Sequence, residues 1–309
     1  MTGSRRSDPE RQPGVVLESV GGVYRVRLDD GDTIPASLRG RLKQELRLGD
    51  KVVAGDRVEV HFGSGDEGTI EKVLPRQTRL VRAGPGGRKP KVVAANVDRM
   101  AAVFSAAHPP FRPEIADRFL VLAEVCELEP VLVVNKIDLV QDGPDVEKEI
   151  EARFRGSGYR VIFSSAETGE GVSELRGLLS GGITILAGPS GVGKSSLLNV
   201  VAPGLELRTG EVSERRGRGR HTTVSARLLE LPMGGWVVDT PGFSEVEFWS
   251  LEPSQLPDAF PEFRLPAERC HFRNCTHLHE PGCGVLEALG AGTIDPSRYE
   301  SYRRLSSSE

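Results

Sequence analysis

The sequence has no long hydrophobic run, few cysteines and no dominant charge, and each absence excludes a class of protein. No stretch approaches about 18 apolar residues, so no membrane-spanning helix is predicted. The polar, basic N-terminus lacks the apolar segment of a secretory signal. Four cysteines in 309 residues do not indicate a disulfide framework, although they leave metal binding open. We therefore expect a cytoplasmic protein that does not enter the membrane.

A net charge of −4 does not indicate a nucleic-acid-binding protein as a whole. The charge is uneven, however, because residues 76–91 and 215–220 form basic runs without acidic residues. Any RNA binding would therefore depend on such local patches.

The N-terminal part of the chain, after a tail at 1–13 that we expect to be disordered, alternates short β-rich runs with Gly- and Asp-rich turns. Five strands are predicted, at 15–17, 23–28, 33–36, 56–60 and 69–73. Five strands within residues 14–81 favour an OB-fold barrel, a frequent RNA-binding fold. Another small barrel that binds protein or serves as a scaffold is the alternative, since only Tyr24 and Phe62 offer a stacking surface.

Residues 92–247 alternate apolar strands with amphipathic helices, which predicts an α/β domain. Its central motif matches G-x-x-x-x-G-K-[ST] between a strand at 183–187 and a helix that begins near Ser196; its residues are Gly188, Pro189, Ser190, Gly191, Val192, Gly193, Lys194 and Ser195. In such a loop the backbone N–H groups hold phosphate, the lysine reaches the β- and γ-phosphates, and the serine hydroxyl ligates Mg²⁺. The sequence therefore predicts a phosphate-binding loop.

Three further segments at strand ends favour GTP over ATP. The motif N-K-x-D is formed by Asn135, Lys136, Ile137 and Asp138. The Asp138 carboxylate can accept two hydrogen bonds from guanine that adenine cannot donate. Ser165 and Ala166 can offer backbone N–H groups to guanine O6, and the motif D-x-x-G supplies Asp239 and Gly242 for Mg²⁺ and the γ-phosphate. Alone, N-K-x-D could be a surface turn; together the motifs indicate a GTPase.

The order of these motifs differs from that of an ordinary GTPase. Here N-K-x-D precedes the phosphate-binding loop, and D-x-x-G comes last. This order is a circular permutation, which a fold with nearby termini tolerates. The segment after Gly242 is then joined directly to the loop that senses the γ-phosphate.

The permuted order, the segments 218–223 and 239–243 and a C-terminal cysteine cluster resemble the bacterial RsgA (YjeQ) family over about residues 14–305. This resemblance implies an OB-fold, a central permuted GTPase domain and a C-terminal α-helical zinc domain at 248–309. It implies a GTPase that binds the 30S ribosomal subunit and 16S rRNA, assists late maturation, and hydrolyses GTP to GDP and phosphate slowly alone and faster with the subunit. We expect it to act as a monomer.

The switch segment carries the candidate hydrolytic residues. Many GTPases place a water-orienting glutamine just after D-x-x-G, but this chain has Phe243 there. His221 is the nearest substitute, and its alternative role is a contact with rRNA phosphate. Thr222 or Thr223 would ligate Mg²⁺, and the residues alone do not choose between them.

Three of the four cysteines, Cys270, Cys275 and Cys283, lie within fourteen residues of each other with three histidines nearby. Thiolates with one imidazole suit a closed, structural Zn²⁺ site with one ion per chain. His271 and His279 compete with His277 on composition, and the family spacing favours His277. The aromatic and basic residues at 298–304 suggest a helical face that binds RNA or a ribosomal protein.

Two other functions remain as alternatives. A permuted GTPase of large-subunit assembly would share the motif order, but the N-terminal barrel and cysteine cluster disfavour it. A non-enzymatic RNA- or protein-binding module with a degenerate nucleotide site is disfavoured by the intact phosphate-binding loop and N-K-x-D motif.

Overall fold

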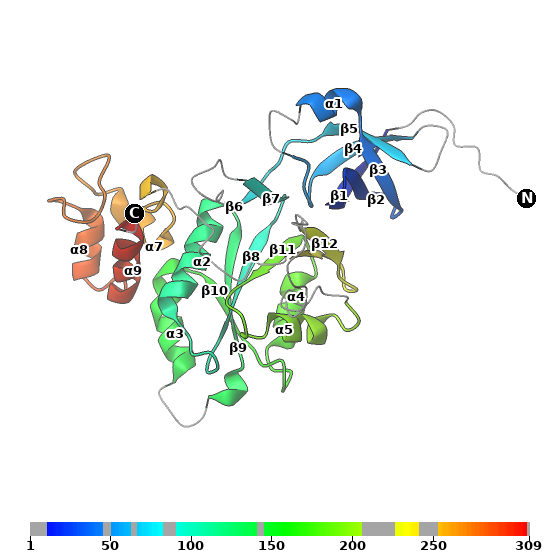
Figure 1. Cartoon of the computed structure of the whole chain (residues 1–309). Helices are drawn as coiled ribbons and strands as arrows, with labels where there is room; N and C mark the ends of the chain where they lie inside the picture. The colour runs from blue at the N-terminus through cyan, green and yellow to red at the C-terminus, as the bar shows by residue number, and fades with distance from the viewer. Residues whose placement is uncertain are drawn as a thin grey trace, which may run out of the picture.

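The computed structural model describes residues 11–45, 51–62, 67–82, 91–140, 145–205, 226–240 and 253–307. Over these ranges the chain forms a small barrel, a central sheet covered by helices on both faces, and a group of C-terminal helices (Figure 1). None of the helices described is long and apolar enough to cross a bilayer.

The N-terminal barrel confirms the predicted OB-fold. Its strands are β1 (Arg11–Val20), β2 (Val23–Leu28), β3 (Thr33–Leu38), β4 (Arg57–Phe62) and β5 (Gly68–Val73), with the short helix α1 (Gly40–Glu45) after β3. The barrel closes in the order β1-β2-β3-β5-β4, with β1 pairing back onto β4. Strand β1 begins at Arg11, so the predicted disordered tail at 1–13 is wrong for its last three residues, which pair with β4. Helix α1 was not predicted.

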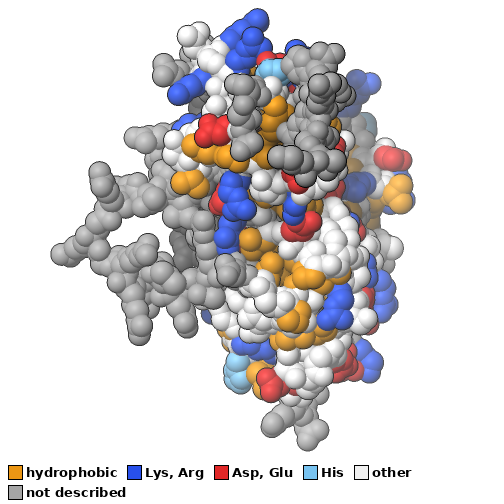
Figure 2. Space-filling model, turned by 90° about the vertical axis from the view of Figure 1, so that its right-hand side faces the viewer, with side chains coloured by type: hydrophobic (Ala, Val, Ile, Leu, Met, Phe, Trp, Pro, Cys, Tyr) orange, Lys and Arg blue, Asp and Glu red, His pale blue; other side chains and the backbone are white. Residues whose placement is uncertain are grey.

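Most cations described on the barrel are paired with carboxylates. Arg25 bonds Glu18, Arg39 bonds Glu71 and Arg57 bonds Asp29, at 2.7–3.0 Å. Arg76, from the predicted basic run, forms an ion pair at 2.7 Å with the buried Asp56 and is not part of a solvent-facing patch. Acidic and basic side chains are also interspersed on the face in Figure 2. The barrel surface is therefore less basic than its arginine content suggests.

A two-stranded hairpin, β6 (Arg79–Arg82) and β7 (Lys91–Ala95), joins the barrel to the sheet. The sequence predicted only a linker at 82–91, whose residues 83–90 lie outside the described ranges. Ala54 of the barrel bridges to Ala94 of β7, so the hairpin is anchored to the barrel.

The central sheet has six strands: β8 (Arg99–Ser105), β9 (Glu129–Asn135), β10 (Arg160–Phe163), β11 (Ile183–Ala187), β12 (Arg227–Glu230) and β13 (Trp236–Asp239). The order is β10-β9-β8-β11-β13-β12, and only the edge strand β12 runs antiparallel to its neighbour. The parallel strands are nearly continuous apolar runs because both faces of the sheet are covered. Their carboxyl ends meet at one edge, where open α/β sheets bind ligands.

Helices cover the two faces of the sheet, as Figure 1 shows. The first face carries α2 (Pro113–Val125), α3 (Val146–Phe154) and a 3₁₀ turn (Arg155–Ser157), and the second carries α4 (Val172–Leu179) and α5 (Lys194–Val201). Alternate residues of β8 serve the two faces: Ala102 and Phe104 join the core of α2, whereas Ala101 and Val103 join that of α5. The predicted α/β domain is thus confirmed.

The C-terminal region, which begins with a 3₁₀ turn (Pro253–Gln255), consists of α7 (Pro261–Ala267), α8 (Gly284–Gly290) and α9 (Pro296–Ser306). Arg298 of α9 is only 1% exposed and bonds Asp117 of α2 (2.6 Å) and Glu262 of α7 (2.7 Å). Tyr299 and Tyr302 are also buried, in the core of this region. The predicted RNA-binding face at 298–304 is therefore wrong for these three residues, because they hold α9 against the neighbouring helices.

The barrel contacts the sheet at the edge strand β12. Arg27 of β2 forms an ion pair with Glu230 and places its guanidinium 6.0 Å from the ring centre of Trp236. Glu230 and Trp236 are opposite each other in the β12–β13 pair. The barrel is thus attached to the hairpin that ends in Asp239.

Candidate nucleotide site and metal centre

The phosphate-binding loop links β11 to α5, as predicted. Gly188 has φ +140°, and a Cβ there would lie 2.1 Å from the Val103 carbonyl oxygen. Gly193 has φ +98°, and its Cβ would lie 2.2 Å from the Asn135 side-chain nitrogen. Only glycine fits at these two close approaches. No side chain among the described residues caps the N-terminus of α5, so no side-chain cap competes with a phosphate for its first N–H groups.

Lys194 is held inside this loop. Its ammonium donates to the carbonyl oxygens of Gly188 (2.6 Å) and Pro189 (2.8 Å). Burial lowers the pKa of Lys194 to about 8, because desolvation disfavours the charged form. A bound phosphate would supply the missing negative charge, so the lysine is poised for an anion.

Asn135 joins three loops. Its side chain is buried and donates to the Val192 carbonyl oxygen at 2.9 Å, while its oxygen accepts from the Ala166 N–H at 3.2 Å. The end of β9, the phosphate-binding loop and the loop after β10 are therefore fixed relative to one another.

Lys136 links the N-K-x-D segment to the phosphate-binding loop. It adopts the left-handed conformation (φ +63°), and its ammonium donates to the carbonyl oxygens of His108 and Gly191, both at 2.6 Å. The next residue, Ile137, begins a 3₁₀ turn (Ile137–Leu139) that carries Asp138. Asp138, on this turn, is exposed to solvent.

Ser165 holds Asp138 in place. The Ser165 hydroxyl donates to the carboxylate at 2.5 Å and accepts from the N–H of Thr168 at 3.0 Å. Its own N–H donates to the Glu170 carbonyl oxygen at 3.0 Å. Both N–H groups that the sequence suggested for guanine O6 are thus bonded within the protein, Ser165 to Glu170 and Ala166 to Asn135, and Ser165 contributes through its hydroxyl.

Asp239 lies at the carboxyl end of β13. It accepts from Arg227 Nε at 3.0 Å, across the directly opposed pair of β12 and β13. Both side chains are largely buried. Sequence reasoning missed Arg227, because only the strand register shows that it faces Asp239.

Other predicted residues fall in three groups. Val192 is buried, whereas Ser190, Ser195 and Ser196 are exposed at the loop and first turn of α5. Four predicted residues lie outside the described ranges: His221, Thr222, Thr223 and Gly242.

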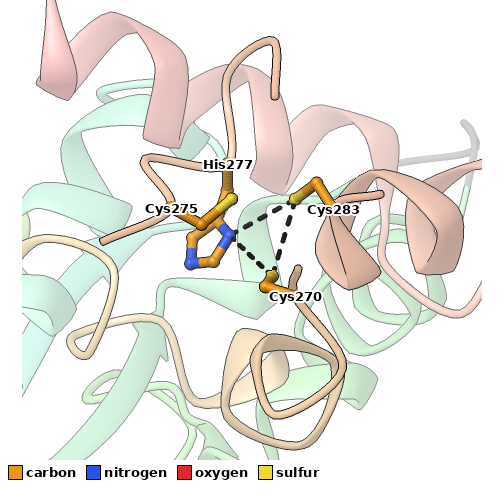
Figure 3. Close-up of side chains that lie close together, drawn as sticks. All are labelled: Cys270, Cys275, His277 and Cys283. Carbon is orange, nitrogen blue, oxygen red and sulfur yellow. Dashed lines mark hydrogen bonds between the residues drawn. The ribbon is translucent and has the colours of Figure 1, made fainter. Parts of the chain in front are cut away.

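The structure brings the predicted metal ligands together (Figure 3). Nδ1 of His277 lies 3.5 Å from Cys270 Sγ and 3.4 Å from Cys283 Sγ, and these two sulfurs are 3.9 Å apart. With Cys275, all four ligand atoms lie within 4.8 Å of one another. The competing His271 and His279 are exposed and outside this group. The cluster could hold a metal ion.

The sequence and structure comparisons identify the family. The RsgA GTPase family matches residues 73–249. Small ribosomal subunit biogenesis GTPases RsgA of Gemmatimonas aurantiaca and Moorella thermoacetica are 45% and 44% identical to this chain, over 94% of it and 95% and 94% of the relatives. This chain belongs to the RsgA GTPase family.

Solved structures agree with this RsgA assignment. YjeQ from Thermotoga maritima superposes with a TM-score of 0.80 at 39% identity, covering 96% of this chain and 98% of that one. YloQ, described as a circularly permuted GTPase, gives 0.77 at 29% identity, covering 98% and 96%. The chain is therefore a GTP-hydrolysing enzyme with the permuted order predicted from its motifs.

In this RsgA chain, the loop 276–280 carries the metal ligand His277, and contacts from α9 and Glu280 shape this loop. The hydroxyls of Tyr299 and Tyr302 donate to the carbonyl oxygens of His277 and Thr276. Glu280 accepts from the N–H groups of Thr276 (2.7 Å) and Leu278 (3.1 Å). Burial opposes ionisation of Glu280, but hydrogen bonds from the Thr276 hydroxyl (2.5 Å) and from the N–H groups of Thr276 and His279 outweigh it and lower its pKa. Sequence reasoning missed these supports.

Proposed function

We propose that this chain binds the 30S ribosomal subunit, assists its late maturation, and hydrolyses GTP slowly alone and faster on the subunit. We further propose that it acts as a cytoplasmic monomer and contacts 16S rRNA. The observation that carries the proposal is that the match to proteins named small ribosomal subunit biogenesis GTPases covers 94% of this chain, well beyond the nucleotide-binding domain. A large-subunit GTPase would share only the permutation.

We assign the nucleotide contacts to the loops described above. Asp138, oriented by Ser165, would accept from guanine, and the Ala166 N–H, which donates to Asn135 Oδ1 at 3.2 Å, would share its hydrogen with guanine O6. The phosphates would lie against the N–H groups of Gly188–Ser196, and the Lys194 ammonium would turn from its carbonyl partners to the β- and γ-phosphates. Gly242 would sense the γ-phosphate.

The Mg²⁺ that accompanies GTP would be held by Ser195 and by Thr222 or Thr223, with Asp239 orienting its water ligands. When bound, the ion neutralises charge that develops on the phosphate oxygens. The donor set fits a hard cation, since it consists of hydroxyl and carboxylate oxygens.

We propose His221 as the residue that orients the attacking water, because Phe243 cannot do so. The test is His221→Ala, measured as turnover on the subunit and as subunit affinity. Loss of turnover with unchanged affinity is expected. Full turnover with weakened affinity would instead assign His221 to rRNA contact.

We propose Zn²⁺, one per chain, as the ion at Cys270, Cys275, His277 and Cys283. Tetrahedral zinc with bonds of about 2.3 Å to sulfur and about 2.05 Å to nitrogen separates its ligand atoms by about 3.5–3.8 Å. The separations of 3.4, 3.5 and 3.9 Å fit that geometry. With four protein ligands and no open position, such an ion is structural.

The deciding experiment measures phosphate release with 30S subunits, with 50S subunits and with neither, using ATP as the control nucleotide. Stimulation by 30S alone is expected. Stimulation by 50S would favour the large-subunit alternative, and no GTP hydrolysis under any condition would favour a binding module.

A further inference from the structure

The loop between the first two metal-binding cysteines exposes an aromatic ring among cations. Phe272 is 42% exposed, and Arg269, His271 and Arg273 around it are exposed as well. The run 269–279 contains no acidic residue. Within the described ranges, neither arginine forms an ion pair. We call residues 269–273 the aromatic loop.

Local contacts hold the aromatic loop in shape. Its Cys270 belongs to the metal cluster, and the His271 N–H donates to the Gly282 carbonyl oxygen at 3.0 Å. The His271 ring meets Phe272 edge-on, with centroids 4.8 Å apart and planes at 89°. A side chain fixed in this way loses little conformational entropy on binding.

We propose that the aromatic loop binds single-stranded RNA: Phe272 stacks on an unpaired base, and Arg269 and Arg273 neutralise the flanking phosphates. Unpaired bases stack on exposed aromatic rings, and guanidinium groups supply the charge that RNA requires. Two guanidinium groups without acidic partners favour RNA over an apolar pocket on a protein. Helix α9 cannot provide the stacking ring, because its Tyr299 and Tyr302 are buried.

This inference rests on the proposed binding to the 30S subunit, whose RNA would supply the base. The test measures affinity for 30S subunits and, separately, for a short fluorescein-labelled single-stranded RNA. The variants are Phe272→Ala, Phe272→Leu, Phe272→Trp and the double variant Arg269→Gln/Arg273→Gln. Leu265→Ala is the control, since Leu265 of α7 is 76% exposed and apolar but lies outside the aromatic loop. Bound zinc and basal GTPase rate verify folding.

Phe272→Ala and Phe272→Leu are expected to weaken binding to both probes by about 5- to 150-fold, as loss of one stacked base does. Phe272→Trp and Leu265→Ala should bind like the wild type. The double arginine variant should reduce the slope of log affinity against log salt by about 1.4, or about 0.7 for each phosphate contact.

Wild-type affinity of Phe272→Ala for both probes would overturn the inference. If Phe272→Leu retained 30S binding while Phe272→Ala lost it, the contact would be with an apolar protein pocket, and the RNA assignment would also fail. The labelled RNA separates the two proposals: if the wild type bound RNA through Phe272 but not 30S subunits, the proposed function would fail and the aromatic loop would stand.

Discussion

The nucleotide site draws its residues from four strand ends between Asn135 and Asp239, whereas the four metal ligands lie between Cys270 and Cys283. In the nucleotide site the polar groups satisfy one another: Lys194 bonds loop carbonyl oxygens, and Asp138 bonds Ser165. In the metal centre, Cys270 and Cys283 direct sulfur atoms at each other, 3.9 Å apart. Thiolates in that arrangement need a cation between them. The first site is thus formed by the fold, whereas the proposed zinc ion would take part in forming the fold around the second.

The largest effect is expected from Cys283→Ser. Structural zinc contributes about 10 kcal/mol or more to folding, so α7–α9 should lose hydrogen-exchange protection while GTP affinity is kept. Exchange measured by mass spectrometry, with zinc content, checks this. Cys126→Ser, outside the cluster, is the control and should behave like the wild type. Retained protection in Cys283→Ser would show that both sites are formed by the fold.

Arg298→Met tests whether the proposed zinc ion is the only interaction that strongly stabilises the C-terminal helices. It would leave the buried Glu262 carboxylate without its arginine, and the buried Asp117 carboxylate with Arg153 alone, at a cost of about 3–5 kcal/mol in the free energy of unfolding. Arg303→Met, an exposed change on the same helix, should cost less than about 0.5 kcal/mol. The two are compared by denaturant unfolding of the zinc-loaded protein. Equal stabilities would leave the metal as the dominant support.

Asp138→Asn tests the claim that the nucleotide site is formed without its ligand. Replacing a charged acceptor that serves two guanine donors should weaken GTP binding by about 10²- to 10³-fold. The melting temperature without nucleotide should change little, because Asp138 is exposed. Xanthosine triphosphate, which offers an acceptor where guanine has an amino donor, should bind better than GTP. A large loss of stability without nucleotide would contradict the claim that the fold forms the nucleotide site independently of these binding residues.

The smallest effect concerns pH. Since the pKa of Lys194 is lowered to about 8 without ligand, the lysine is charged below that pH and becomes neutral above it. Phosphate favours the charged form, so binding above pH 8 takes up a proton, and GTP affinity should fall by up to about tenfold per pH unit. Below pH 8 this group should add no pH dependence. Calorimetric titrations between about pH 7 and pH 9 check this, and Lys194→Met should lack the slope.

Sequence reasoning succeeded where information is local. The phosphate-binding loop, N-K-x-D and the cysteine spacing each lie within a few residues, and the strands before the first two motifs are plain apolar runs. It failed where a residue's burial or pairing depends on a partner that the local sequence does not show. Arg298 has the sequence context of a surface residue, yet its partner Asp117 lies 181 positions away. Arg227 likewise faces Asp239 only through the strand register.

The edge strand β12 makes one contact at each of its ends. Glu230 at one end meets Arg27 of the barrel, and Arg227 at the other holds Asp239. Arg227 and Glu230 are three positions apart in the strand, a span of about 10 Å. A tilt of about 6° at the barrel end would shift the other end by about 1 Å, a misplacement that can cost a catalytic group about 100-fold in rate. A slight rotation of the barrel would therefore displace Asp239 by a distance that matters for hydrolysis.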